Sequence, residues 1–152
     1  MIERLLALAD SKEKDLEYFY TISLQRHIGK NLNVKSVEEF KNEFREERTI
    51  FLSIINDEKI IGYIILINEI DAVQLKRIVI DENHLGIGQE VLRLLEKYCL
   101  KTFNTSRLWL DVYADNLRAI NAYKKVGYTQ FKKGRENSRE VVFYKLDLMK
   151  DK

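Results

Sequence analysis

Hydrophobic residues recur along the chain with two different spacings, and these spacings predict the order of strands and helices. Short runs rich in β-branched residues, such as 73–80 (VQLKRIVI), are typical of strands, whereas apolar residues three and four positions apart, as in 88–103, indicate helices. In chain order we expect a strand at 2–8, a helix at 12–27, a helix that starts after Ser36, strands at 49–55, 60–67 and 73–80, a helix at 88–103, a strand at 107–113, a helix at 116–126, and strands at 128–131 and 141–148.

Polar residues and glycines mark several boundaries between these elements. Ser36, with Glu39 three residues later, has the spacing of a capping box, which favours a helix start. Residues 56–59 (NDEK) lie between two apolar strands and predict a hairpin turn. Gly127 follows the 116–126 helix and suits the left-handed conformation that commonly ends helices.

Two of the predicted helices have an apolar face that should reach the core. These faces consist of Leu16, Phe19, Tyr20, Ser23 and Leu24 in the first helix, and of Val91, Leu94, Leu95 and Tyr98 in the 88–103 helix. Cys99 lies on the same apolar stripe, and we interpret it as a core residue rather than a reactive thiol.

The mixture of antiparallel hairpins with one β-α-β crossover predicts an α/β domain with a mixed sheet. The length of 152 residues suits one domain, and neither a proline nor a Gly/Ser-rich linker interrupts it. We therefore expect a single domain over residues 1–152.

Charge and composition narrow the class of protein. The formal net charge is only +2, from 26 basic and 24 acidic residues, whereas nucleic-acid-binding proteins usually have a strong basic excess; we interpret the basic group 132–135 (KKGR) as a solvated turn. No apolar run approaches the roughly 20 residues that span a bilayer, and the N-terminus lacks the layout of a signal peptide. The single cysteine suits a reducing compartment, so we expect a cytoplasmic protein that binds neither nucleic acid nor membrane.

A glycine-containing loop at 83–88 (NHLGIG) joins a predicted strand to a predicted helix and is the strongest sign of function. Two glycines one residue apart let the backbone bend where side chains would clash, and they leave N–H groups accessible at the positive end of a helix. Such a loop suits a phosphate or diphosphate. The position three residues after Gly88 is Val91 rather than the glycine of a Rossmann loop, and Gln89 and Glu90 stand where a Walker A loop has Lys and Ser/Thr.

Two blocks of sequence resemble the GNAT superfamily of acetyl-CoA-dependent N-acetyltransferases. Residues 75–99 (LKRIVIDENHLGIGQEVLRLLEKYC) resemble its cofactor-binding strand, loop and helix, although Asn83 stands where the family pattern has Arg or Gln. Residues 110–128 (LDVYADNLRAINAYKKVGY) resemble its fifth strand and the helix that follows. The resemblance implies an α/β fold with a mixed, mostly antiparallel sheet and helices on both faces.

The resemblance also implies how acetyl-CoA is bound. The backbone of one strand would pair with the pantetheine arm, the N–H groups of the loop would hold the diphosphate, and the later helix would contact the arm. The residues implied are Ile78, Val79 and Ile80 in the strand, Asn83, His84, Leu85, Gly86, Ile87, Gly88 and Gln89 in the loop, and Asn116, Ala119 and Tyr123 in the helix. Asn116 also suits a helix N-cap.

Catalysis in the family needs a proton for the departing thiolate, a donor to the oxyanion and a base for the amine. Tyr123 occupies the family's general-acid position, and a backbone N–H at or near Val79 is the family's usual oxyanion donor. Asp111 lies on the predicted strand before that helix, where protein N-terminal acetyltransferases of the family commonly carry a carboxylate, so the resemblance makes it our candidate for the base. Gln74 stands where many members have Glu, and it cannot act as a base. Glu69 and Asp71 are further candidates for the base, and His27 is a candidate for the acceptor site.

The predicted function is therefore transfer of an acetyl group from acetyl-CoA to a primary amine by direct attack. The acceptor, either a small-molecule amine or a protein N-terminus, stays open, as does the choice between a homodimer and a monomer. Two alternatives remain: a non-catalytic acyl-CoA-binding module, and a nucleotide-binding or interaction domain whose glycines are coincidental. Two histidines and one cysteine, widely spaced, predict no metal site.

Overall fold

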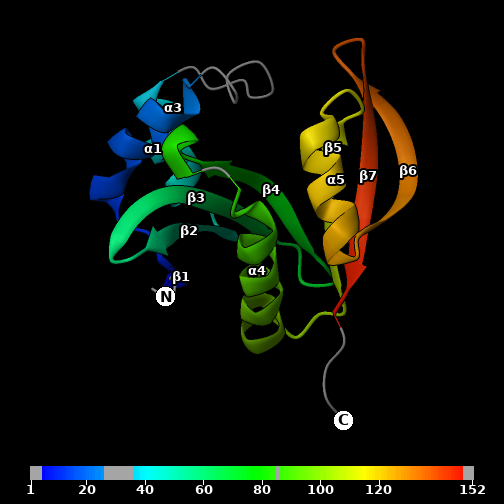
Figure 1. Ribbon diagram of the computed structural model, residues 1–152, viewed down its shortest axis with the longest axis horizontal. Coiled ribbons are helices and arrows are strands. Elements are labelled where there is room, and N and C mark those ends of the chain that lie inside the picture. Colours follow the sequence, from blue (N-terminus) through cyan, green and yellow to red (C-terminus); the bar gives the residue numbers. More distant parts are fainter. Residues whose placement is uncertain (1–4, 26–35, 85, 149–152) are drawn as a thin grey trace.

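The computed structural model describes residues 5–25, 36–84 and 86–148. The strands form one seven-stranded sheet in the order β1-β2-β3-β4-β5-β7-β6 (Figure 1). The strands are β1 (Leu6–Asp10), β2 (Thr49–Asn56), β3 (Lys59–Asn68), β4 (Val73–Ile80), β5 (Arg107–Tyr113), β6 (Thr129–Glu136) and β7 (Arg139–Asp147). The helices are α1 (Leu16–Ser23), α3 (Val37–Arg45), α4 (Gly88–Thr102) and α5 (Leu117–Val126), with 3₁₀ turns η1 (Glu13–Asp15) and η2 (Glu82–His84).

All strand pairs are antiparallel except β4 with β5. The β2–β3 hairpin turns at Asp57 and Glu58, whose positive φ angles of 50° and 72° suit the right-handed twist of the strands. The structure therefore confirms the predicted mixed, mostly antiparallel sheet and the predicted hairpin.

The two parallel strands meet only at their beginnings, through the pairs Val73–Leu108 and Gln74–Trp109. Lys76 is an extra residue in β4, because Leu75 pairs with Leu66 whereas Arg77 pairs with the adjacent Ile65. Such a bulge bends a strand. Beyond it β4 and β5 diverge toward the upper part of Figure 1, so that the sheet opens into two halves.

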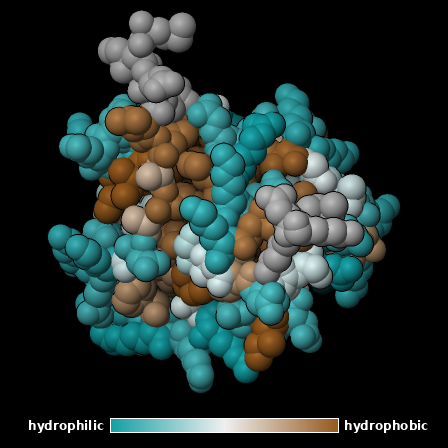
Figure 2. Space-filling view, turned by 90° about the horizontal axis from the view of Figure 1, so that it is seen from below, coloured by the Kyte–Doolittle hydropathy of each residue, from teal (hydrophilic) through white to brown (hydrophobic). Residues whose placement is uncertain are grey.

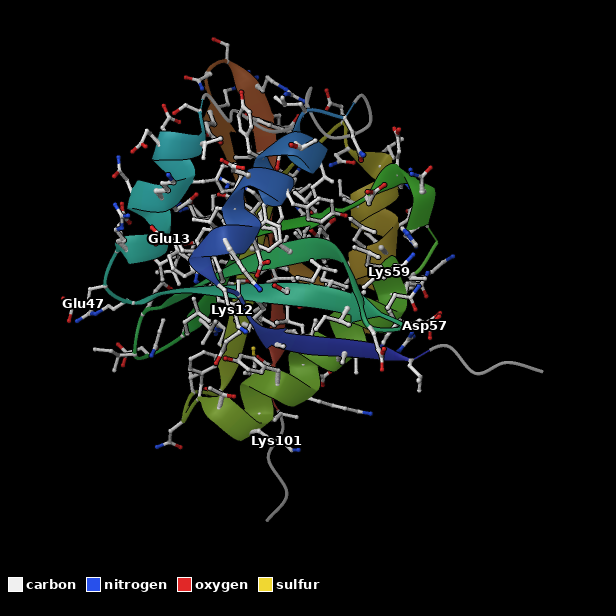
Figure 3. The ribbon with its side chains drawn as sticks, turned by 90° about the vertical axis from the view of Figure 1, so that its left-hand side faces the viewer. Lys12, Glu13, Glu47, Asp57, Lys59 and Lys101 are labelled. Atoms are coloured by element: carbon white, nitrogen blue, oxygen red, sulfur yellow. The ribbon has the colours of Figure 1, made fainter. Side chains whose placement is uncertain are left out.

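Helices cover both faces of the sheet, as predicted. Alternate residues of β3 point to opposite sides: Ile64 and Leu66 join the core beneath α4 and α5, while Tyr63 and Ile65 join the core beneath α1 and α3. Figure 3 shows α1 and α3 over the nearer face, with Glu13 beside α3 and with Asp57 and Lys59 at the β2–β3 turn.

The two edge strands differ in chemistry. The edge strand β6 extends from Thr129 to Glu136, and therefore includes residues 132–135, which were predicted as a solvated turn. That prediction was wrong because an edge strand needs pairing on one side only, and its charged residues reach water and discourage further pairing. The opposite edge, β1, is apolar before Asp10, and hydrophobic residues gather in the left half of the face seen in Figure 2, the half that holds β1 in Figure 1.

Several helix details differ from the predicted pattern. In α1, Leu24 was placed on the apolar face but is 56 % exposed, because it follows Ser23, the last residue of the regular helix. Ile22, which was not selected, is buried. In α4, Leu92 is buried, whereas Leu94 and Tyr98 are only partly buried, because the helix contacts both the sheet and α5. Cys99 is buried in the core, as predicted. Among the described helices, none has the length and hydropathy of a membrane-spanning segment.

Candidate active site

A cleft of about 550 Å³ lies where β4 and β5 separate. Its walls come from β4, the loop before α4, the end of β5, the first turns of α5 and the tips of β6 and β7. The volume is in the range of small-molecule sites in proteins. The cleft therefore opens where the pairing of β4 with β5 ends, next to the bulge in β4.

One end of the cleft is suited to an anion. Gly86 has a φ of +100°, and Gly88 is the first residue of α4. A Cβ added at either glycine would meet no atom within 4 Å, so both open onto free space. Ile87 holds the N-cap position and has no polar side chain to satisfy the first N–H groups of the helix, which leaves them for a bound phosphate.

The loop is attached to the N-terminal helices through Asp81. Its carboxylate accepts hydrogen bonds from the Asn83 backbone N–H at 3.0 Å and from the Tyr18 hydroxyl at 3.1 Å. Burial alone would raise the pKa of Asp81, but these bonds and one from Gln25 outweigh it and hold the pKa below its ordinary value. Burial and the Asp81 charge raise the pKa of Tyr18 to about 12, so Tyr18 stays a hydrogen-bond donor.

The wall formed by β4 is suited to an extended chain. Between Leu75 and Val79, the edge of β4 that faces β5 has no paired strand among the described residues. Backbone groups on such an edge can pair with an extended ligand as with an added strand. The side chains of Ile78 and Ile80 pack against the core beneath α4 and α5, while Val79 packs on the opposite face.

Tyr123 reaches the cleft from α5 and is only 8 % exposed. The helix is held at both ends, since the Asn116 side chain accepts from the Ala119 N–H at 3.4 Å and Gly127 has a φ of +114°. Burial first, and then the negative charge of Asp111, raise the pKa of Tyr123 far above its ordinary value. The phenol therefore stays protonated and has a proton to donate.

Asp111 lines the cleft from β5 and is exposed. Partial burial first, and then the charge of Glu136 on β6, raise the pKa of its carboxyl. The other acids considered as bases do not line the cleft: Glu69 accepts from the Trp109 indole N–H at 2.6 Å, and Asp71 is exposed before β4. A carboxylate with a raised pKa is a stronger base than an ordinary one.

The structure brings together most, but not all, of the residues implied by the resemblance. Those that line the cleft are Ile78, Val79, Ile80, Gly86, Gly88, Asp111, Asn116, Ala119 and Tyr123. Asn83, His84, Ile87 and Gln89 do not line it, and Ile87 is buried. Leu85 and His27 lie outside the described residues.

Four charged residues that were not predicted from the sequence also line the cleft: Lys76, Arg77, Arg118 and Glu136. Arg77 forms an ion pair with Glu43 of α3 at 3.1 Å, and Lys76 binds the same carboxylate. Arg118 lies between Asn116 and Ala119, so its position inside that block was an available signal. The sequence offered no comparable signal for Glu136, which reaches the cleft from a distant hairpin.

Within the described residues, no group of His, Cys, Asp and Glu could hold a metal ion.

Comparison with known proteins identifies the family of the chain. The profile of the acetyltransferase (GNAT) family matches residues 12–128. No curated protein matches the chain by sequence.

Several solved structures share the fold. The chain is similar to the ribosomal-protein-S18-alanine N-acetyltransferase from Escherichia coli, with a TM-score of 0.81 and 20 % identity over 97 % of each chain. It is similar to the spermidine N-acetyltransferase from Vibrio cholerae bound to CoA and spermine, with a TM-score of 0.80 and 15 % identity over 94 % of this chain and 95 % of that one. An aminoglycoside acetyltransferase in complex with coenzyme A has a TM-score of 0.82 and 17 % identity, with the same coverage.

Proposed function

The chain belongs to the GNAT family of acetyl-CoA-dependent acetyltransferases, and on that basis we propose that it transfers the acetyl group directly to a primary amine, with Tyr123 as the general acid. The observation that carries the proposal is the cleft between β4 and β5. It has an anion-binding loop at one end and the side chains of Tyr123 and Asp111 on its walls.

The β4 wall and the α4 N-terminus would bind the cofactor. Backbone groups of Ile78 and Val79 are suited to the pantetheine arm, and the N–H groups around Gly86 and Gly88 are suited to the diphosphate. A backbone N–H at or near Val79 would donate to the oxygen of the acetyl group as negative charge develops there.

Tyr123 and Asp111 would handle the two protons of the reaction. Asp111 accepts a proton from the attacking amine, directly or through a water, and Tyr123 donates its proton to the departing sulfur. A phenol is a weaker acid than a thiol, so this transfer is uphill by about 1.4 kcal/mol for each unit by which the two pKa values differ. Burial of Tyr123 increases that difference, and its position in the cleft must compensate.

The acceptor is a small-molecule amine or a protein N-terminus. The structural neighbours include enzymes named for spermidine, for aminoglycosides and for the alanine of ribosomal protein S18, which span this range. Two carboxylates, Asp111 and Glu136, line the cleft and suit a cationic acceptor.

The test is release of free CoA from acetyl-CoA in the presence of a panel of amines. The panel should contain polyamines, amino sugars, amino acids and peptides with free N-termini, with an acetylated peptide as a control. We expect amine-dependent release of CoA. Binding of acetyl-CoA without release for any amine would contradict the proposal and favour a non-catalytic acyl-CoA-binding module.

A further inference from the structure

We propose that Arg118 binds the phosphate groups of the cofactor and supplies the positive charge that the glycine loop lacks. The inference rests on the proposed function, because it concerns the cofactor of that reaction. It differs from the family resemblance, which selected Asn116 and Ala119 on either side of this residue but not Arg118 itself.

The glycine loop is a poor electrostatic site for a diphosphate. Residues 78–92 contain no lysine or arginine, but they contain three carboxylates, Asp81, Glu82 and Glu90. Asn83 does not line the cleft, and its backbone N–H is already donated to Asp81. Backbone N–H groups and the helix dipole carry only partial charges, each worth a fraction of a full cation. A cation from another element would offset this acidity.

Three basic side chains line the cleft, and two of them are already paired. Lys76 and Arg77 both bind Glu43, whose side chain is only 13 % exposed. Arg118 is exposed and, within the described part of the chain, makes no ion pair or hydrogen bond. Its guanidinium is therefore available to a ligand without loss of an existing interaction.

The position of Arg118 matches that role. It lies in the first turn of α5, which Asn116 caps, and it lines the same cleft as Gly86 and Gly88. Figure 1 shows α4 and α5 side by side, and their contact is part of the core beneath them. A guanidinium presents several N–H donors in one plane and can bind a phosphate through two hydrogen bonds.

The test compares CoA binding by calorimetry in the full chain and in three variants. Arg118→Gln removes the charge, Arg118→Lys keeps it, and Lys125→Gln removes an equivalent exposed charge from the same helix outside the cleft. We expect Arg118→Gln to raise the Kd for CoA by roughly tenfold, the effect of one lost hydrogen bond between charged groups. Arg118→Lys should recover part of the affinity, and Lys125→Gln should change the Kd less than about twofold.

Two further measurements separate the phosphates and check for indirect effects. The first measurement repeats the comparison with 3′-dephospho-CoA. If Arg118→Gln still raises the Kd, Arg118 contacts the diphosphate; if the Kd no longer changes, Arg118 contacts the 3′-phosphate. Both results support the proposal. Unchanged affinity for CoA in a folded Arg118→Gln protein would overturn it, as would an equal loss in Lys125→Gln. If the wild-type chain bound no CoA at all, the proposed function itself would fail.

Discussion

The pKa values of individual side chains in the cleft depend first on burial and then on the charges of their neighbours. Tyr123 and Asp111 come from different elements, yet the charge of Asp111 contributes to the raised pKa of Tyr123. Glu136 in turn contributes to the raised pKa of Asp111. The two proposed proton carriers and Glu136 thus form one electrostatic unit, and a change in one is expected to alter the next.

Removal of the Tyr123 hydroxyl tests the general acid. Tyr123→Phe keeps the ring and should lower kcat by roughly 10²-fold, with little change in the Kd for acetyl-CoA, because only the proton donor is lost. Tyr128→Phe is a matched control, since the Tyr128 hydroxyl is buried and, among the described residues, has no hydrogen-bond partner. Pre-steady-state kinetics would show whether product release hides the chemical step. Wild-type kcat in Tyr123→Phe with chemistry limiting would rule out the acid role.

Neutralisation of Glu136 tests the base. Asp111 must be ionised to accept a proton, so activity should rise with pH through its pKa. Glu136→Gln removes a nearby negative charge, which lowers the pKa of Asp111 and should move the acidic limb of the kcat/KM profile to lower pH. Glu140→Gln, an exposed glutamate outside the cleft, should leave that limb in place. An unshifted limb in Glu136→Gln would mean that another group is the base.

Gly88 offers a test of the phosphate loop that does not strain the backbone. The sequence suggested that side chains would clash at both glycines, but a positive φ occurs only at Gly86. Gly88→Ala adds a methyl group to open space at the start of α4, so stability should stay equal or rise by about 0.5 kcal/mol. The same methyl group should block the approach of a phosphate and raise the Kd for acetyl-CoA by roughly tenfold. Denaturant unfolding and calorimetry on one sample check both; unchanged affinity would contradict the loop assignment.

Among the secondary-structure elements, β4 decides the shape of the site. Its first residues pair with β5, its bulge at Lys76 turns it away, and its last residues form the cleft wall. Gly62 on β3 lets the last part of β4 lie close to β3, because a Cβ at this position would be only 2.3 Å from the Val79 carbonyl oxygen. This glycine is needed for a close approach of two backbones.

Substitution of Gly62 should therefore affect both stability and ligand binding. Gly62→Ala must displace Val79 and should destabilise the protein by about 1–3 kcal/mol, with a weaker affinity for acetyl-CoA. Gly134→Ala, in β6, is the matched control, because its Cβ would meet only side-chain atoms of Phe143 and Val141. Urea unfolding and calorimetry would measure the two effects. Equal losses of affinity in both variants would show that the β4 wall has no special role.

At the scale of the whole molecule, the two halves of the sheet are joined by only two residue pairs between β4 and β5. The cleft between them is lined from both halves. A ligand bound there would contact both halves, and a ligand that binds only the folded state stabilises it by about 2.7 kcal/mol at one hundred times its Kd.

We therefore expect acetyl-CoA at that concentration to raise the unfolding temperature by roughly 5–10 °C. Differential scanning calorimetry with and without acetyl-CoA measures the shift. Gly88→Ala at the same ligand concentration should give a smaller shift, since its affinity is expected to be lower. The absence of any shift in the wild-type chain would contradict cofactor binding in the cleft.

Local signals explain which parts of the fold were predictable. The bounds of β4 and β5 match the prediction, and Ser36, Asn116 and Gly127 cap helices as expected. These features depend on side chains and backbone within a few residues of one another. The end of the first helix was predicted less well: the helix was expected to reach residue 27, but α1 ends at Ser23. Neither a glycine nor a proline follows Ser23 directly to mark this end.

The sequence by itself determined the mixed α/β order, the glycine loop at a strand-to-helix junction and, through a family resemblance, the selection of Tyr123 and Asp111. Only the tertiary structure decided that Arg118 and Glu136 line the same cleft, that Lys76 bulges from β4, and that the sheet opens after Gln74. The physical reason is that hydrophobic spacing and capping act over a few residues. The cleft, in contrast, depends on strand register, on the bend at a bulge and on close approach at Gly62, which join segments far apart in the chain.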